Sequence, residues 1–178
     1  MCKFIQIDSL YKISPNYLEY ISLFENCYHK YFKYIQDDFS QYKNICELVK
    51  YVNPYLWLIL DYEKNFKGFV FLDNFVGNKN YTYSAELTTC FEKSAWGNYT
   101  GYCAKVFLKK CFDKLGLQKI KAQVYTDNFR VKTLLKNSGF TYESTLKNET
   151  MRHGKLQDIE VYGLYKSYYY KNEEKIYE

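Results

Sequence analysis

A glycine-containing segment near the middle of the chain has the composition of a loop that opens a helix. Residues 94–105 read SAWGNYTGYCAK, with Gly97 and Gly101 four positions apart among hydroxyl and amide side chains. The first N–H groups of a helix lack intrahelical partners and, with the helix dipole, favour an anion such as a phosphate. The two glycines would let such a ligand approach the backbone closely. A plain capped turn explains the same residues, and the segment is neither a Walker loop nor a GxGxxG fingerprint.

A single carboxylate, Glu86, occurs in a stretch that has the pattern of a strand. The stretch reads AELTTCF, and Glu86 precedes Trp96 by ten residues. A carboxylate buried among apolar neighbours is costly without partners, and burial raises its pKa toward the range of a general base. A solvent-facing strand residue is the alternative, and the local sequence leaves this choice open.

A third segment, residues 127–140, reads DNFRVKTLLKNSGF. Asn128 can cap a short helix that stops at Gly139, and Phe140 can then enter the core. These roles are architectural and need no ligand. By itself the segment favours a structural role over a functional one.

Hydrophobic periodicity predicts the elements that position these residues. An i, i+3, i+4 pattern running from Ala104 to Leu115 indicates an amphipathic helix directly after the glycine segment. The last residues, 168–178, are polar and are expected to form a frayed tail. Strands are expected at 3–7, 56–63, 69–75, 81–91, 119–125, 140–152 and 155–166, and further helices at about 15–35, 40–53 and 128–138. This order predicts one α+β domain over residues 1–178.

Composition restricts the class of protein. The chain has 178 residues, 47% of them hydrophobic, and a net charge of +5. Its basic residues are spread along the chain with no block of five, so nucleic-acid binding is an unfavoured reading. The 22 tyrosines are interpreted as compositional bias rather than a binding signature. The longest apolar run, LWLIL, is too short to span a bilayer, and the N-terminus lacks a signal-peptide core.

The cysteines and histidines do not have metal-binding spacing. Six cysteines are scattered without a CxxC pair, and His29 and His153 are far apart, so no metal is expected. Buried free thiols in a reducing compartment fit this pattern best, with Cys46, Cys103 and Cys111 in helices. We therefore expect a cytoplasmic protein that is not in a membrane.

In their order along the chain, the three segments resemble the GCN5-related N-acetyltransferase (GNAT) superfamily. They are most similar to the branch that acetylates the N-termini of ribosomal proteins and related amines. The stretch WGNYTGYCA is similar to that branch's W-G-x-G-x-x-x-E-A, Asn128 to its N-x-x-S, and Gly139-Phe140 to its closing G-F. The resemblance covers roughly residues 56–166.

The resemblance implies a fold and a cosubstrate. The fold is a central mixed sheet of about seven strands with about four helices on its two faces. Acetyl-CoA would enter a V-shaped opening between the parallel strands 81–91 and 119–125, and Glu86 would be the general base, acting through a water. The residues implied in binding acetyl-CoA are Cys90 and Phe91 at the thioester, Trp96, Gly97, Asn98, Tyr99, Thr100, Gly101 and Tyr102 around the pyrophosphate, and Asn128 at the pantetheine arm.

The sequence departs from the family pattern at four positions, one of which is Cys103 in place of the glutamate of the E-A pair. Tyr99 replaces the first glycine of the pyrophosphate loop, which puts the affinity for the cosubstrate in question, whereas Gly101 keeps the second. Leu135 stands where many members have a tyrosine acid, and Val131 replaces a serine in the same helix. Tyr99 or Tyr102 could donate the proton instead.

The implied activity is transfer of an acetyl group from acetyl-CoA to a primary amine by direct attack in a ternary complex. The acceptor would be a protein N-terminus or a small amine, and the protein a monomer or homodimer. The alternative is a catalytically weak or inactive acyl-CoA-binding or regulatory protein of the GNAT fold, and a nucleic-acid-binding protein is a third. Four acidic residues would attract a cationic amine if they face the site, and otherwise belong to solvated strand faces: Glu143, Glu149, Asp158 and Glu160.

Overall fold

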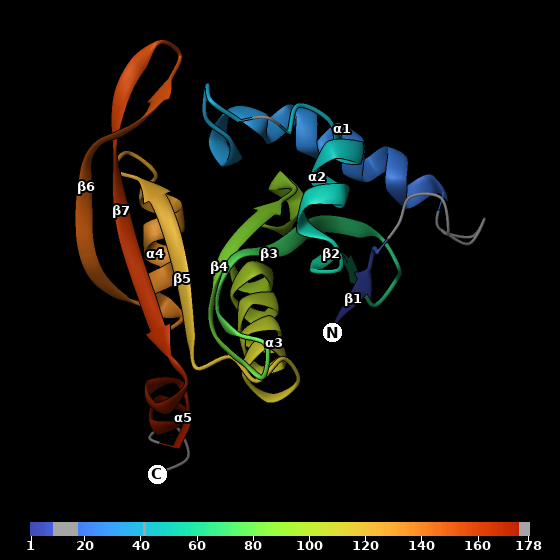
Figure 1. Cartoon of the computed structure of the whole chain (residues 1–178). Coiled ribbons are helices and arrows are strands. Elements are labelled where there is room, and N and C mark those ends of the chain that lie inside the picture. Colours follow the sequence, from blue (N-terminus) through green and yellow to red (C-terminus); the bar gives the residue numbers. More distant parts are fainter. Residues whose placement is uncertain (9–17, 41, 175–178) are drawn as a thin grey trace.

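A mixed seven-stranded sheet forms the centre of the molecule (Figure 1). The computed structural model describes residues 1–8, 18–40 and 42–174. The strand order is β1-β2-β3-β4-β5-β7-β6, and each neighbouring pair is antiparallel except β4 and β5, which run parallel. The strands are β1 (Cys2–Gln6), β2 (Leu56–Asp61), β3 (Phe66–Asn78), β4 (Tyr81–Phe91), β5 (Lys119–Tyr125), β6 (Thr141–Arg152) and β7 (Lys155–Tyr165).

Helices pack on both faces of the sheet and give it two apolar cores. The helices α1 (Leu18–Ile35) and α2 (Ile45–Val52) bury Phe24 and Leu48 against one face. The helices α3 (Asn98–Asp113), α4 (Phe129–Asn137) and α5 (Lys166–Glu174) cover the other face. Strand β2 is buried along most of its length because alternate side chains enter the two cores, with Trp57 in one and Leu58 in the other.

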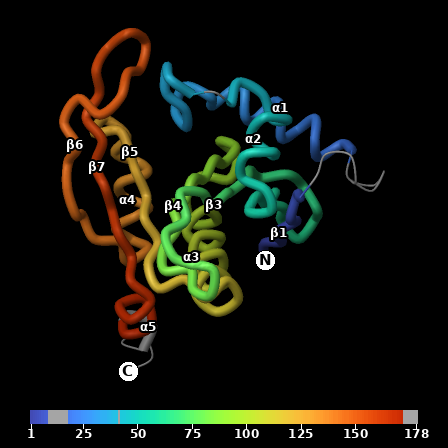
Figure 2. Tube along the Cα trace, in the orientation of Figure 1, coloured from blue at the N-terminus to red at the C-terminus, as the bar shows by residue number. Residues whose placement is uncertain are grey.

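The parallel strands β4 and β5 part after a short paired stretch. They pair from Ser84 to Glu86 against Lys119 to Lys121, and no further pairing joins them in the described sheet. The trace in Figure 2 shows the two strands close at one end and diverging at the other. The sheet is therefore split into a β1–β4 half and a β5–β7 half on one side of Glu86.

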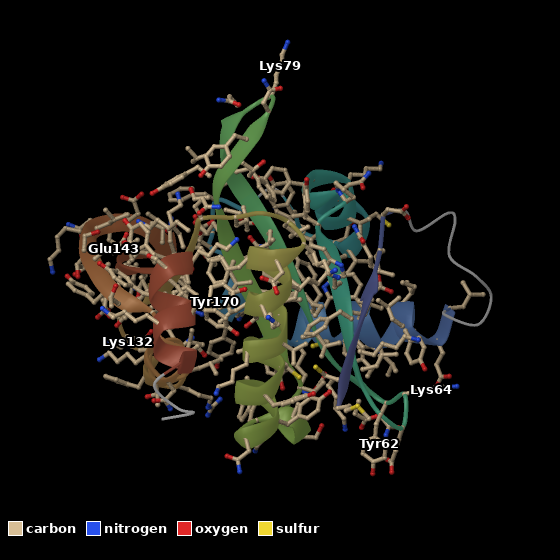
Figure 3. All side chains as sticks on the ribbon, turned by 90° about the horizontal axis from the view of Figure 1, so that it is seen from below. Tyr62, Lys64, Lys79, Lys132, Glu143 and Tyr170 are labelled. Carbon is tan, nitrogen blue, oxygen red and sulfur yellow. The ribbon has the colours of Figure 1, made fainter. Side chains whose placement is uncertain are left out.

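The hairpin of β3 and β4 extends beyond the other strands. Figure 3 shows Lys79 at its tip. Residues 74–81 of this hairpin are exposed, and pairing runs to Asn78 and Tyr81. The end of β4 near Phe91 lies at the opposite end of the hairpin and leads into a short 3₁₀ turn, Lys93–Ala95.

The predicted fold class is confirmed, and several predicted boundaries were wrong. The described part of the chain contains five α-helices rather than about four, because residues 166–174 form α5 where a frayed tail was predicted. Tyr169 is 7% exposed and packs on Phe112, so the tyrosine run gives this polar segment an apolar face. Strand β3 is also longer than predicted, reaching from Phe66 to Asn78.

Two helix starts also differ from the prediction. Helix α2 begins at Ile45 rather than near Ser40, because the Asn44 side chain caps it by accepting from the Glu47 N–H. Helix α3 begins at Asn98, inside the segment predicted as a loop. Cys103 and Cys111 are buried in α3 as predicted, but Cys46 is exposed on α2.

In the described residues no helix is long and apolar enough to cross a membrane. Within the same residues no three His, Cys, Asp or Glu side chains gather as a metal site would require. The single-domain boundary, the cytoplasmic location and the oligomeric state stay predictions.

Candidate active site

A cavity of about 400 Å³ opens where β4 and β5 part. Its walls come from both halves of the sheet, from α3 and α4 on one face, and from α2 and the end of α1 on the other. Three of the sequence-predicted site residues line it, namely Glu86, Phe91 and Asn128. The remaining predicted residues do not line it: seven lie in the first turns of α3 or just before it, and Cys90 packs in the core beneath α1.

Glu86 is half-buried in β4 at the point where the strands separate. Its Oε2 accepts hydrogen bonds from Asn74 Nδ2 at 3.3 Å and Gln123 Nε2 at 3.2 Å. Burial raises the pKa of this carboxyl, while the two amides and the Lys121 charge act in the opposite direction. The site therefore holds a carboxylate with a strengthened tendency to take a proton.

A second carboxyl, Asp73, lies beside it and was missed from the sequence. Asp73 of β3 is the cross-strand partner of Glu86 and lines the same cavity. Its Oδ1 is buried without a hydrogen-bond partner. Burial, followed by the Glu86 charge, raises the pKa of Asp73 to about 7. The available sequence signal was an acid directly after the apolar run FVFL, two positions after the buried Phe71.

The N-terminus of α3 has the features of an anion site. Gly97 is the N-cap residue with φ 101°, and no side chain caps the helix there. The first N–H groups of the helix, from Asn98 to Thr100, are those that lack intrahelical acceptors. A side chain at Gly101 would meet nothing within 4 Å, so the first turn has open space beside it.

The side chains around this turn hold the segment in place. Tyr99 is half-buried against the α3-side core, and its hydroxyl donates to Leu60 O at 3.1 Å. The Thr100 hydroxyl donates to Ala95 O at 2.7 Å. Trp96 Nε1 donates to Phe91 O at 3.1 Å. The tyrosine that replaces the family glycine thus points into the fold rather than over the helix N-terminus.

Arg130 brings a positive charge to this region and was not identified from the sequence. It is exposed on α4, and its guanidinium lies 3.6 Å from the centre of the Trp96 ring. The contact joins α4 to the segment before α3, across the side of the molecule where β4 and β5 part. Its only sequence signal was a basic residue two positions after Asn128.

Asn128 and Cys90 have structural contacts. The Asn128 Oδ1 accepts from the Val131 N–H at 3.3 Å and caps α4, which is the architectural alternative considered for it. The Cys90 sulfur lies on the α1 face, 3.9 Å from the Cys27 sulfur. Any role of either residue toward acetyl-CoA stays a prediction.

The tyrosines that line the cavity are not the two that the sequence suggested as proton donors. The described residues that line it do not include Tyr99 or Tyr102, whereas Leu135 and Val131 do line it. Its tyrosines are Tyr34, Tyr42, Tyr51 and Tyr125.

One of the four acidic residues considered for the acceptor lines this cavity. Glu149 of β6 does so. The other three are in ion pairs: Glu143 with Lys119 at 2.7 Å, Asp158 with Lys147 at 2.7 Å and Glu160 with Lys132 at 3.0 Å (Glu143 and Lys132 are labelled in Figure 3). Asp37, just after α1, is a further lining acid that the sequence did not single out.

The segment after α1 connects the β1–β4 half of the sheet with the β6–β7 hairpin of the other half. The Asp38 N–H donates to Met151 O at 2.9 Å. The Asp38 carboxylate accepts from the N–H groups of His153 at 3.1 Å and Gly154 at 2.8 Å. The Tyr125 hydroxyl donates to Gln36 O at 3.3 Å. Because Gln36 and Asp37 line the cavity, these bonds join the two halves of the sheet beside it.

Comparison with known proteins agrees with this arrangement. A family model described as an acetyltransferase (GNAT) domain matches residues 21–141. A comparison with curated proteins gave no match.

Solved structures share the fold at low sequence identity. The spermidine N-acetyltransferase of Vibrio cholerae, in complex with CoA and spermine, has a TM-score of 0.72 and 20% identity over 95% of this chain and 98% of that one. A variant of that enzyme has a TM-score of 0.73 and 20% identity over 97% and 99% of the two chains. A chimera of the V. cholerae enzyme with hSSAT has a TM-score of 0.70 and 22% identity over 95% and 98%.

Proposed function

The chain belongs to the GNAT acetyltransferase family, and from that membership we propose that it acetylates a small primary amine. Its class is that of an acetyl-CoA-dependent N-acetyltransferase. The observation that carries the choice of reaction is the half-buried Glu86, which lines a cavity at the point where the two parallel strands part. The ribosomal-protein branch and a protein N-terminus as acceptor gain no support from the comparisons and are not part of the proposal.

The α3 N-terminus fits the diphosphate of acetyl-CoA. Unpartnered N–H groups and the helix dipole favour an anion there, and Gly101 leaves room for it. Arg130, held over Trp96, adds a positive charge nearby. We assign the diphosphate to the N–H groups of Asn98 to Thr100, with Arg130 as an additional contact.

The cavity suits a cationic amine. Carboxylates line it, and tyrosine rings stand among them, so an ammonium group would find both charge and aromatic faces. The V. cholerae protein that shares this fold is a spermidine N-acetyltransferase, and its crystal structure is a complex with CoA and spermine. This similarity supports a polyamine as the acceptor class. The acidic groups of the cavity are Asp37, Asp73, Glu86 and Glu149.

The chemistry needs one proton to leave before the acetyl group moves. A primary ammonium has a pKa of about 10 in water, so it arrives protonated at neutral pH. Glu86 accepts that proton, directly or through a water, and the neutral nitrogen attacks the thioester carbonyl carbon. The carbon–sulfur bond then breaks, and the sulfur leaves as a thiolate whose ordinary pKa is about 8.5. Such a leaving group needs no strong acid, which is compatible with Leu135 in the cavity.

The first test combines binding and turnover. Isothermal calorimetry should show binding of acetyl-CoA, and an assay of free-thiol release should show acetylation within a panel of polyamines, monoamines and peptides. Absence of acetyl-CoA binding would contradict the proposal. Binding without acetylation of any amine would favour the catalytically silent alternative.

The second test concerns Glu86. Glu86→Gln should lower kcat by about 100-fold or more, the usual contribution of a general base, while the affinity for acetyl-CoA stays nearly constant. Asp158→Asn is the matched control, because this carboxylate pairs with Lys147 and is not among the cavity acids. An unchanged kcat in Glu86→Gln would remove Glu86 from the proton transfer.

A further inference from the structure

We propose that Asp73 is the second member of a carboxyl pair with Glu86, and that the pair rather than Glu86 alone takes the proton of the amine. This inference rests on the proposed function. Asp73 and Glu86 are directly opposite on the antiparallel strands β3 and β4 and line one cavity. Residues directly opposite in such a ladder project from the same face of the sheet.

The two carboxyls differ in their hydrogen bonds. Glu86 Oε2 accepts from two side-chain amides, Asn74 and Gln123, which favour its ionised form. Asp73 Oδ1 is buried and has no partner. A proton shared by the pair is therefore better placed on Asp73. The directions of the pKa shifts agree, since burial raises both and the Glu86 charge raises Asp73 further, to about 7.

Other charged and titratable groups face the pair from each neighbouring element. The Lys121 charge on β5 lowers the pKa of both carboxyls. Tyr51 of α2 stacks on Tyr42 with ring centres 4.1 Å apart, and a hydrogen bond with Tyr42 and then burial raise the pKa of Tyr51 to about 12. Tyr51 is therefore neutral near pH 7. The same cavity receives Tyr34 from α1, Asp37 after α1, Tyr125 from β5 and Glu149 from β6.

The proton balance follows from this arrangement. The ammonium passes one proton to the ionised pair, where it rests on Asp73, and the nitrogen lone pair forms the new carbon–nitrogen bond. The carbon–sulfur bond breaks, and the nitrogen loses its second proton to the thiolate, which leaves as a thiol. The pair then returns its proton to solvent. One ammonium and one thioester give one amide, one thiol and one released proton.

The kinetic test is the pH profile of kcat/KM for one amine, compared between variants so that the titration of the amine itself cancels. The native profile should lose activity as pH falls through about 7. In Asp73→Asn the carboxyl that titrates near pH 7 is absent, so only Glu86 has to ionise and the acidic limb should move to lower pH. Asp158→Asn should leave the limb in place. A lower kcat in Asp73→Asn with an unmoved limb would indicate a purely structural role and overturn the proposal.

A titration that needs no turnover separates this proposal from the proposed function. Carboxyl-carbon NMR of the native protein should show a titration step near pH 7 in addition to the ordinary acidic steps. In Asp73→Asn that step should vanish, and in Glu86→Gln the Asp73 step should move lower. If no amine is acetylated but these steps appear, the pair stands and the proposed function fails. If the native protein shows no carboxyl step above pH 6, the pair is disproved whatever the activity.

Discussion

At the residue scale, Tyr99 has the side chain that departs most from the family loop. Its hydroxyl bonds Leu60 O and its ring packs on the core, so the substitution changes how α3 is anchored rather than how an anion reaches its N-terminus. The backbone N–H of Tyr99 remains in the first turn of the helix. The replacement of glycine by Tyr99 is therefore compatible with anion binding at the N-terminus of α3.

A conservative substitution tests this reading of Tyr99. Tyr99→Phe should cost about 1 kcal/mol of unfolding free energy, the usual value of one hydrogen bond, and leave the affinity for acetyl-CoA unchanged. Urea unfolding and calorimetry measure the two quantities. Tyr102→Phe is the control, because Tyr102 is exposed on the same helix. A large loss of affinity in Tyr99→Phe would show that the hydroxyl serves the ligand.

Asp73 also has a consequence for stability. The pKa of Asp73 is raised to about 7 in the folded protein, against about 3.9 in an unfolded chain, so folding takes up a proton between these values. Stability from this group is full below pH 4 and is lost as pH rises through 7. Asp73→Asn should thus match the native protein near pH 4 and exceed it by about 2 kcal/mol at pH 8, after allowance for partial exposure. Equal stability of the two proteins at both pH values would contradict the raised pKa.

At the element scale, two glycines shape the start of α3 in different ways. Gly97 permits the backbone conformation of the N-cap, and Gly101 leaves space beside the first turn. Gly97 has φ 101°, a conformation that side-chain-bearing residues rarely adopt, whereas Gly101 lies in the helix with open space beside it. Both positions would accept a methyl group without a clash. Their different backbone conformations predict opposite effects of the same substitution.

Alanine at the two positions makes that comparison. Gly97→Ala should destabilise the protein by about 1–2 kcal/mol, because a left-handed conformation is costly with a Cβ atom. Gly101→Ala should stabilise it by up to about 1 kcal/mol through helix propensity, yet weaken acetyl-CoA binding several-fold by filling the space beside the first turn. Thermal unfolding and calorimetry read the two effects. Unchanged affinity in Gly101→Ala would place the diphosphate elsewhere.

At the scale of the whole molecule, the split sheet depends on connections between its two halves. The strands β4 and β5 provide one, over three residue pairs, and the Asp38 bonds to the β6–β7 hairpin provide another beside the cavity (Figure 1). This part of the cavity wall is therefore shaped by segments more than a hundred residues apart. We expect its geometry to be sensitive to Asp38.

Removal of the Asp38 carboxylate tests this connection. Asp38→Ala should raise KM for the amine more than it changes acetyl-CoA affinity, because the loop follows Gln36 and Asp37, which line the cavity. Hydrogen bonds from the Gly154 and His153 N–H groups lower the pKa of Asp38, so its contribution is present above the unfolded pKa and lost as pH falls through the folded value. Steady-state kinetics, with the amine and acetyl-CoA varied in turn, measures the two effects separately. An equal change in both constants would speak against a local effect.

The sequence by itself determined the fold class and most of its elements, because period-2 and period-3.6 patterns report which face of each segment is buried. Strand β4 was predicted at its observed bounds, and the seven strands were all found. The α5 helix was missed because its stability comes from packing Tyr169 on Phe112, a contact that no local pattern contains.

Only the tertiary structure decided which side chains share the site. The sequence singled out Glu86 and the segment that opens α3, but Asp73 became a partner of Glu86 through the β3–β4 register, and Arg130 reached Trp96 through the packing of α4. The Tyr99 ring likewise turned inward because Leu60 O and the core lay within reach. Residue types and spacing predict the chemistry that a chain can carry, whereas strand register and helix packing determine which groups meet, since those contacts join residues distant in sequence.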